Sequence, residues 1–127
     1  MPDAPTARDL EEFFAGRPLA AELFEVLRPA LESAGPSEIR VTRSQVAFSR
    51  RRGFAWVWIP DRYLDGHRNL APLVLSVALS RHDRSSRWKQ VVEPVPGRWM
   101  HHLEVWRPAD VDDEVRRWIA EAWSEAA

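Results

Sequence analysis

Arginine, histidine and glutamine side chains are the groups in this chain best suited to bind an anion. The candidates are Arg43, Gln45, Arg52, Arg98, His101 and His102. A guanidinium group donates paired hydrogen bonds to a phosphate or carboxylate, and amide and imidazole groups add further donors. If the strands carrying these residues lie close together, they form an anion pocket that Trp99 helps to shape. Otherwise the arginines cover the sheet edge or pair with Glu93 and Glu104.

The adjacent histidines His101 and His102 suggest acid–base chemistry. A histidine beside Arg98 is suited to a phosphoester or nucleotide-processing enzyme, which is the first alternative to a binding function. Neighbouring residues of a strand point to opposite faces, so we expect one histidine against the core and the other in solvent. No serine lies in a recognisable elbow or triad, so the catalytic residues of such an enzyme are unknown.

Metal and cofactor sites are not predicted. His102 and Glu104 are two residues apart, and His67 or Glu93 could join them, but a metal site needs three or four well-placed ligands. The chain has no cysteine, which excludes disulfides and thiolate ligands. Its five glycines are scattered, so there is no glycine-rich phosphate loop.

The chain contains seven tryptophans, which either fill the core or stack on a ligand. We expect the four in apolar stretches to lie in or near the core: Trp56, Trp58, Trp118 and Trp123. Trp88 and Trp106 have polar or charged neighbours, so we expect them to be exposed. With an exposed sheet edge, they would support protein–protein interaction or dimerisation, which is the second alternative.

Charge is divided unevenly along the chain although the net charge is -1. Residues 1–38 carry three basic and eight acidic residues, residues 39–107 carry 13 and five, and residues 108–127 carry two and six. A basic middle segment therefore lies between acidic ends, a layout that attracts anions to one face. The overall pI near 6.4 argues against strong nonspecific binding of nucleic acid. The triplet Arg50-Arg51-Arg52 is expected at a hairpin tip, either solvated or gripping phosphates.

Apolar spacing predicts two N-terminal helices and one C-terminal helix. Leu19, Leu23, Leu27 and Leu31 repeat at every fourth residue, and Gly35-Pro36 ends that helix. The pattern switches to period two at Ile39–Thr42 and Val46–Ser49, and strands are predicted at Phe54–Ile59, Leu73–Ser80, Trp88–Val92 and Trp99–Trp106. The order ααββββ(β)α predicts an α+β fold in which an antiparallel sheet of four or five strands packs against these helices.

Length and composition predict one globular domain over residues 7–125. No apolar run approaches the ~18 residues of a membrane span, so no membrane association is expected. The N-terminal segment is acidic, unlike a secretory signal, and this favours a cytoplasmic location. Whether the domain is a monomer or a dimer is left open.

Four strings of the sequence together resemble the DUF5655 family of small bacterial domains over roughly residues 10–125. They are Thr42–Phe48, Arg52–Ala55, Glu93–His102, and Val111–Val115 leading to Trp118. The most specific part is Pro-Gly-Arg-Trp-x-His-His in the third string. The resemblance implies a stand-alone soluble domain and supplies no activity. The residues themselves favour a small binding module for an anionic small molecule, a nucleotide or an acidic protein segment on a basic Arg/His/Trp sheet surface.

Overall fold

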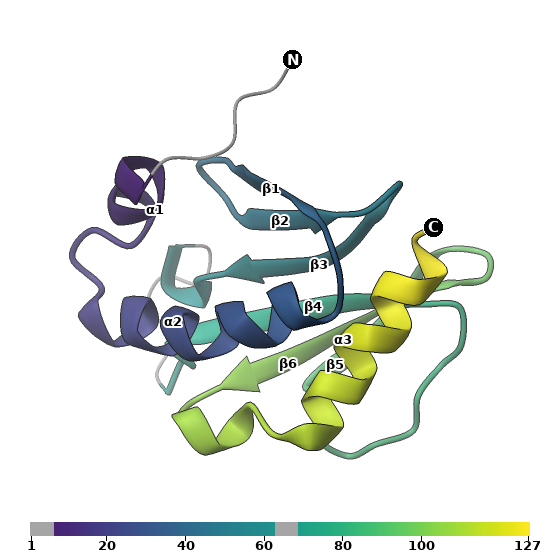
Figure 1. Ribbon diagram of the computed structural model, residues 1–127. Helices are drawn as coiled ribbons and strands as arrows, with labels where there is room; N and C mark the ends of the chain where they lie inside the picture. The colour runs from purple at the N-terminus through teal and green to yellow at the C-terminus, as the bar shows by residue number, and fades with distance from the viewer. Residues whose placement is uncertain (1–6, 63–68) are drawn as a thin grey trace.

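The computed structural model describes residues 7–62 and 69–127. These residues form three α-helices and a six-stranded antiparallel sheet (Figure 1). The helices are α1 (Ala7–Phe13), α2 (Pro18–Ser33) and α3 (Asp113–Glu125), with short 3-10 helices η1 (Pro60–Arg62) and η2 (Pro108–Asp110). The strands are β1 (Glu38–Val41), β2 (Val46–Ser49), β3 (Gly53–Trp58), β4 (Leu73–Leu79), β5 (Gln90–Val95) and β6 (Arg98–Val105). The predicted α+β class is confirmed, with six strands rather than four or five.

Strand β5 differs most from its predicted position. The sequence predicts a strand at Trp88–Val92 followed by a turn, whereas the strand extends to Val95 and includes Pro94. Proline cannot donate to a β-ladder, but β5 is an edge strand and needs a partner on one side only. The pairing with β6 is irregular between Val92 and Val95, where the proline lies.

The strand order is β1-β2-β3-β4-β6-β5, and all neighbouring strands are antiparallel. The first four strands follow one another as a meander. The last strand, β6, then pairs with β4 and leaves β5 at the edge. Strands β3 and β6, which carry Trp56 and Arg98, are therefore separated by the single strand β4.

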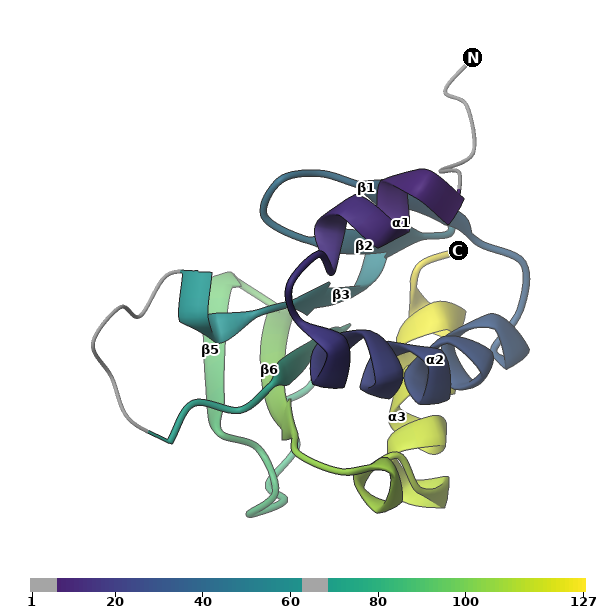
Figure 2. The same cartoon turned by 90° about the vertical axis from the view of Figure 1, so that its left-hand side faces the viewer.

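The two faces of the sheet have different surroundings. Helices α2 and α3 pack on one face, and neither covers the other (Figure 2). On the helix-bearing face, Ala55, Val77 and His101 lie in one row across β3, β4 and β6, and all three are buried. The next row, on the helix-free face, places Trp56 beside Ser76 and Ser76 beside His102. The alternation predicted for the strands therefore decides which side chains can meet.

The core lies between the sheet and the two long helices. Leu23, Leu27 and Leu31 of α2 and Ile119 of α3 are fully buried there, as their helical spacing predicts. The Asp112 carboxylate accepts a hydrogen bond from the Val115 backbone N–H and caps the start of α3. Within the described ranges, no helix has the length and apolar character needed to cross a bilayer.

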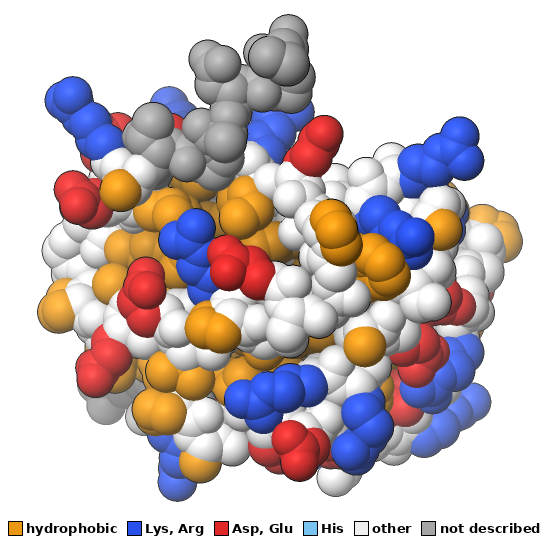
Figure 3. Space-filling view, in the orientation of Figure 1, with side chains coloured by type: hydrophobic (Ala, Val, Ile, Leu, Met, Phe, Trp, Pro, Cys, Tyr) orange, Lys and Arg blue, Asp and Glu red, His pale blue; other side chains and the backbone are white. Residues whose placement is uncertain are grey.

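The uneven charge of the sequence becomes a difference between two layers. The acidic ends supply the helices, and the basic middle supplies the sheet with its turns. Ion pairs join the layers: Arg87 contacts Asp112 at 2.9 Å, and Arg81 contacts Glu121 at 2.8 Å. On the helix-bearing side, acidic and basic side chains accordingly lie next to one another (Figure 3).

The tryptophan predictions are confirmed in part. Trp118 is buried and Trp106 is 41 % exposed, as expected. The prediction for Trp88 is wrong, because this side chain is only 8 % exposed. Its indole packs against the ring of Trp118 at 4.2 Å, and its Nε1 donates to the Asp83 carboxylate at 2.8 Å. The Asp83 carboxylate satisfies the indole N–H, so charged sequence neighbours do not keep this ring in water.

Three other tryptophans expected in or near the core are half-buried. Trp123 packs at the edge of the core, and its Nε1 donates to the Pro36 carbonyl at 2.9 Å. Trp56 and Trp58 project from β3 on the helix-free face, outside the main core cluster. The strand is apolar on both sides, but helices cover only one of them.

Candidate functional site

His101 is fully buried on the helix-bearing face and makes two hydrogen bonds. Its Nε2 accepts from the Asp83 backbone N–H at 3.0 Å, so Nδ1 carries the proton that it shares with the Trp99 carbonyl at 3.1 Å. Burial lowers the pKa of this imidazole. His101 is therefore a neutral structural residue that fixes the loop after β4 to β6.

His102 lies on the opposite face in a different network. Its Nδ1 is 2.6 Å from the Ser76 hydroxyl, and that hydroxyl oxygen accepts from Trp58 Nε1 at 2.9 Å. The simplest assignment has Ser76 donating to Nδ1, so that Nε2 carries the imidazole proton. Burial and the nearby His101 lower the pKa of His102. This half-exposed ring thus offers a neutral N–H donor rather than a positive charge.

The two histidines do not share a site. Consecutive residues of β6 point to opposite faces, as the sequence predicts, with His101 in the core and His102 on the helix-free side. The two rings therefore cannot act together in one cavity, as an enzyme that uses both histidines would require. Trp99 lies on the same face of β6 as His101, not on the face of Arg98, and its ring stacks on His82 with centroids 4.7 Å apart.

Arg52 and Arg98 are the two sequence candidates that the fold brings together. Both line a small hollow of about 50 Å³ at the end of the sheet, together with Gly97. Arg52 donates to the Glu125 backbone carbonyl at 2.8 Å, and Arg98 donates to the Gly53 carbonyl at 2.9 Å. These bonds use one nitrogen of each guanidinium and fix its position, leaving the other N–H groups for a ligand.

The positive charges at this hollow have no ion-pair partner within the described part of the chain. Arg81 and Arg87 elsewhere in the basic segment are bonded to carboxylates. Arg52 and Arg98 bond to backbone carbonyls instead, and no described carboxylate oxygen lies within 4.0 Å of either guanidinium. Two uncompensated guanidiniums beside one hollow favour a negatively charged occupant.

The turn that carries Arg52 docks on the C-terminal end of α3. The backbone N–H groups of Arg51 and Arg52 both donate to the Ala126 carbonyl, at 2.9 and 3.2 Å. Arg50 donates to the Trp123 carbonyl at 3.3 Å, and its guanidinium carbon lies 3.7 Å from the centroid of that indole. Cationic groups complement the negative end of a helix dipole, so the arginine triplet has a structural role.

One carboxylate, that of Glu125, also lines the hollow. Its two oxygens accept from the Ser80 backbone N–H at 3.1 Å and from the Ser80 hydroxyl. These bonds hold the carboxylate on the Ser80 side. The lining therefore contains two guanidiniums against one carboxylate that is already hydrogen-bonded.

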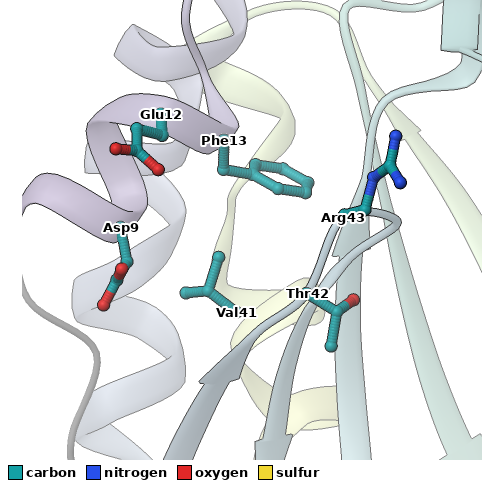
Figure 4. A pocket seen from close by; sticks show the side chains of 6 residues that line it. All are labelled: Asp9, Glu12, Phe13, Val41, Thr42 and Arg43. Carbon is teal, nitrogen blue, oxygen red and sulfur yellow. The ribbon is translucent and has the colours of Figure 1, made fainter.

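Arg43 and Gln45 lie at the other end of the sheet, in the turn between β1 and β2. The Gln45 backbone N–H donates to Thr42 Oγ1 at 3.2 Å, so this segment is a hydroxyl-stabilised turn. Arg43 lines a larger cavity of about 510 Å³ with Asp9 and Glu12 of α1, into which the Phe13 ring projects (Figure 4). Two carboxylates oppose one guanidinium there, which disfavours an anion.

A metal site is not supported by the side chains of residues 7–62 and 69–127. No group of three or more histidine, aspartate or glutamate side chains in these ranges is placed to hold an ion. Glu93 instead accepts a hydrogen bond from the Gly97 backbone N–H at 3.0 Å. His67, the other potential partner of His102, lies outside the described residues.

A family model described as a domain of unknown function, DUF5655, matches residues 10–126. The chain belongs to the DUF5655 family. No curated protein and no solved structure matches the chain. The DUF5655 match includes Arg52, Arg98 and the whole of α3, so the hollow lies within the family domain. The domain's function therefore has to be inferred from its own side chains.

Proposed function

We propose that this DUF5655 domain binds an anionic group between Arg52 and Arg98. The observation that carries the proposal is the convergence of two guanidiniums, from separate parts of the chain, on one hollow without a carboxylate partner in ion-pair contact among the described residues. The volume of about 50 Å³ suits a single phosphoryl, sulfate or carboxylate group rather than a whole cofactor. The group belongs either to a small molecule or to an acidic side chain of a partner.

The expected affinity for an isolated anion is low. Each charge-assisted hydrogen bond contributes about 1.5–3 kcal/mol. Two such bonds correspond to a dissociation constant on the order of 1 mM. The negative end of α3 and the Glu125 carboxylate reduce the attraction further. A screen must therefore reach millimolar anion, and a natural ligand needs contacts beyond the hollow.

Thermal unfolding with and without anions tests the proposal. Phosphate or sulfate at 1–50 mM (about one to fifty times the expected dissociation constant) should raise the Tm of the wild-type chain at constant ionic strength. Arg98→Gln and Arg52→Gln should each abolish that rise, whereas Arg43→Gln at the far end of the sheet should retain it. Comparing the Tm of each variant with and without the anion separates binding from any loss of stability caused by the substitution. Equal rises in all four proteins would contradict the proposal.

Self-association through β5 is a second candidate function. This edge strand exposes Val92 and Val95, which are 37 % and 51 % exposed. Unpaired edge strands with apolar side chains are templates for pairing with another chain, although Pro94 interrupts this one. Light scattering should then show a mass that rises with concentration in the wild type and not in Val95→Lys. A monomeric mass at high concentration would exclude this candidate.

A further inference from the structure

We propose that the ligand of the Arg52/Arg98 hollow also carries a planar aromatic ring, which packs on Trp56. The inference rests on the proposed anion site and names the class of ligand: a ring joined through a short linker to one phosphoryl group, as in a nucleoside monophosphate. Its basis is the position of Trp56 beside Arg98 on the helix-free face of the sheet.

Trp56 is not one of the residues that line the hollow, but it lies next to Arg98 on the face of the sheet that neither α2 nor α3 covers. The Arg98 guanidinium carbon is 6.0 Å from the centroid of the Trp56 indole, and its hydrogen bond to Gly53 keeps it there. A ligand whose anionic group binds Arg98 can therefore extend past this guanidinium to the half-exposed indole. A planar substituent on that anion can cover the exposed part of the indole and gain stacking energy.

The indole of Trp56 is held in place before any ligand arrives. A side chain at Gly53 would put its Cβ 2.6 Å from the indole Cζ2, so the ring lies directly over the glycine backbone. The Arg98 guanidinium is a second neighbour of the ring, 6.0 Å from its centroid. A fixed aromatic surface loses little conformational entropy when a ligand stacks on it, which favours binding.

A hydrogen-bond donor lies farther along the same face. Trp56, Ser76 and His102 occupy one row across three adjacent strands, so Trp56 and His102 are roughly 10 Å apart at the backbone. The Ser76 contact assigns the His102 proton to Nε2, and the ring is half-exposed. Nitrogen or oxygen acceptors at the far edge of a ring system match this donor. A nucleobase has such acceptors, whereas a simple phenyl group does not.

An experiment with four probes separates the ring from the anion. Isothermal titration of the whole chain uses inorganic phosphate, ribose 5-phosphate, adenosine monophosphate and adenosine. Adenosine monophosphate should bind about tenfold more tightly than ribose 5-phosphate, a gain typical of stacking one base. Trp56→Leu should remove this difference and leave ribose 5-phosphate binding unchanged. Trp106→Leu, which changes an exposed indole elsewhere, should have no effect.

The outcomes distinguish this inference from the function on which it rests. If no phosphate-bearing probe binds, the anion site itself is wrong. If adenosine monophosphate and ribose 5-phosphate bind equally, or Trp56→Leu preserves their difference, the anion site stands and the ring inference is wrong. If adenosine binds as well as its monophosphate, the ring binds without the anion and the combined ligand is excluded. Trp56→Phe retains an aromatic face and should keep part of the tighter binding of adenosine monophosphate. This variant keeps the inference testable if Trp56→Leu does not fold.

Discussion

The guanidinium carbon of Arg98 lies 6.0 Å from the centroid of the Trp56 indole, although strand β4 separates the strands that carry them. Arg98 reaches across the end of β4, where the hollow is lined by the small side chain of Ala78, and bonds to the Gly53 carbonyl. One side chain thus links an anion site to an aromatic surface. The same contact makes the stability of this corner and its ligand binding depend on a shared set of residues.

Gly53 should be needed for the position of Trp56. In Gly53→Ala the new methyl group would meet the indole at 2.6 Å, and the ring must shift. We expect a loss of about 1–3 kcal/mol in the free energy of unfolding, which urea denaturation measures. The loss should be smaller when Trp56→Leu is already present, because the clashing ring is then absent. Equal losses in both backgrounds would show that the glycine acts independently of Trp56.

Asp83 should make stability fall in acid. Burial alone would raise the pKa of this carboxyl, but hydrogen bonds from Trp88, Arg81 and the Ser85 backbone outweigh it and lower the pKa from 3.8 to about 2. The resulting stabilisation is complete above pH 4 and is lost as the pH falls towards 2, because the unfolded chain takes up the proton first. Its size is about 2 kcal/mol, from a shift of nearly two units.

Asp83→Asn checks this pH dependence. The variant should lose stability at pH 7 and show a flatter fall between pH 4 and 2 in urea titrations. Asp113→Asn is the control, because the Asp113 side chain is 91 % exposed and its contact with Arg116 is long, at 3.5 Å. If Asp83→Asn falls as steeply as the wild type over this range, another carboxylate is responsible.

His101 should contribute a second pH dependence at higher pH. Burial lowers the pKa of the ring below its ordinary value of 6.5, so protons bind preferentially to the unfolded chain. Stability is therefore retained above pH 6.5 and decreases as the pH falls below it. His101→Leu should reduce this decrease and leave only the part that comes from His102, whose pKa is also lowered. The variant should cost about 1–3 kcal/mol at pH 7, because the Asp83 backbone N–H loses its acceptor. A decrease below pH 6.5 that is as large in His101→Leu as in the wild type would contradict this assignment.

Ser76 should control the protonation of His102. The hydroxyl donates to Nδ1 and so stabilises the neutral ring. Ser76→Ala should raise the pKa of His102, and two-dimensional nitrogen NMR of the imidazole should detect the change. The ring resonances of His82, which stacks on Trp99, should not move and provide an internal control. An unchanged His102 titration would mean that the serine does not donate to this ring.

Local patterns predict the elements and faces of this fold well. Alternation along β6 separates His101 from His102 correctly, because side-chain direction in a strand depends only on neighbouring residues. The four-residue repeat of leucines similarly identifies the buried face of α2 from Leu23 onward, but the prediction is wrong for Leu19, which is 50 % exposed in the first turn. Trp88 is predicted wrongly, since its burial depends on the Asp83 carboxylate, which a loop brings to it.

The candidate site depends on contacts that local patterns do not determine. Arg52 and Arg98 meet because β6 pairs with β4 rather than with β3 or β1, and this order follows from the packing of the whole sheet. Arg43 lies at the opposite end for the same reason. Trp56 is assigned to the core from its apolar strand, and only the placement of both long helices on the other face leaves it half-exposed.

Phosphate titration followed by backbone amide NMR tests the central claim most directly. With millimolar phosphate at constant ionic strength, the largest shifts should come from the residues around the hollow, including Gly53, Ser80 and Gly97. These shifts should disappear in Arg98→Gln and persist in Arg43→Gln. Shifts centred on the β1–β2 turn, or no saturable shifts at all, would contradict an anion site between Arg52 and Arg98.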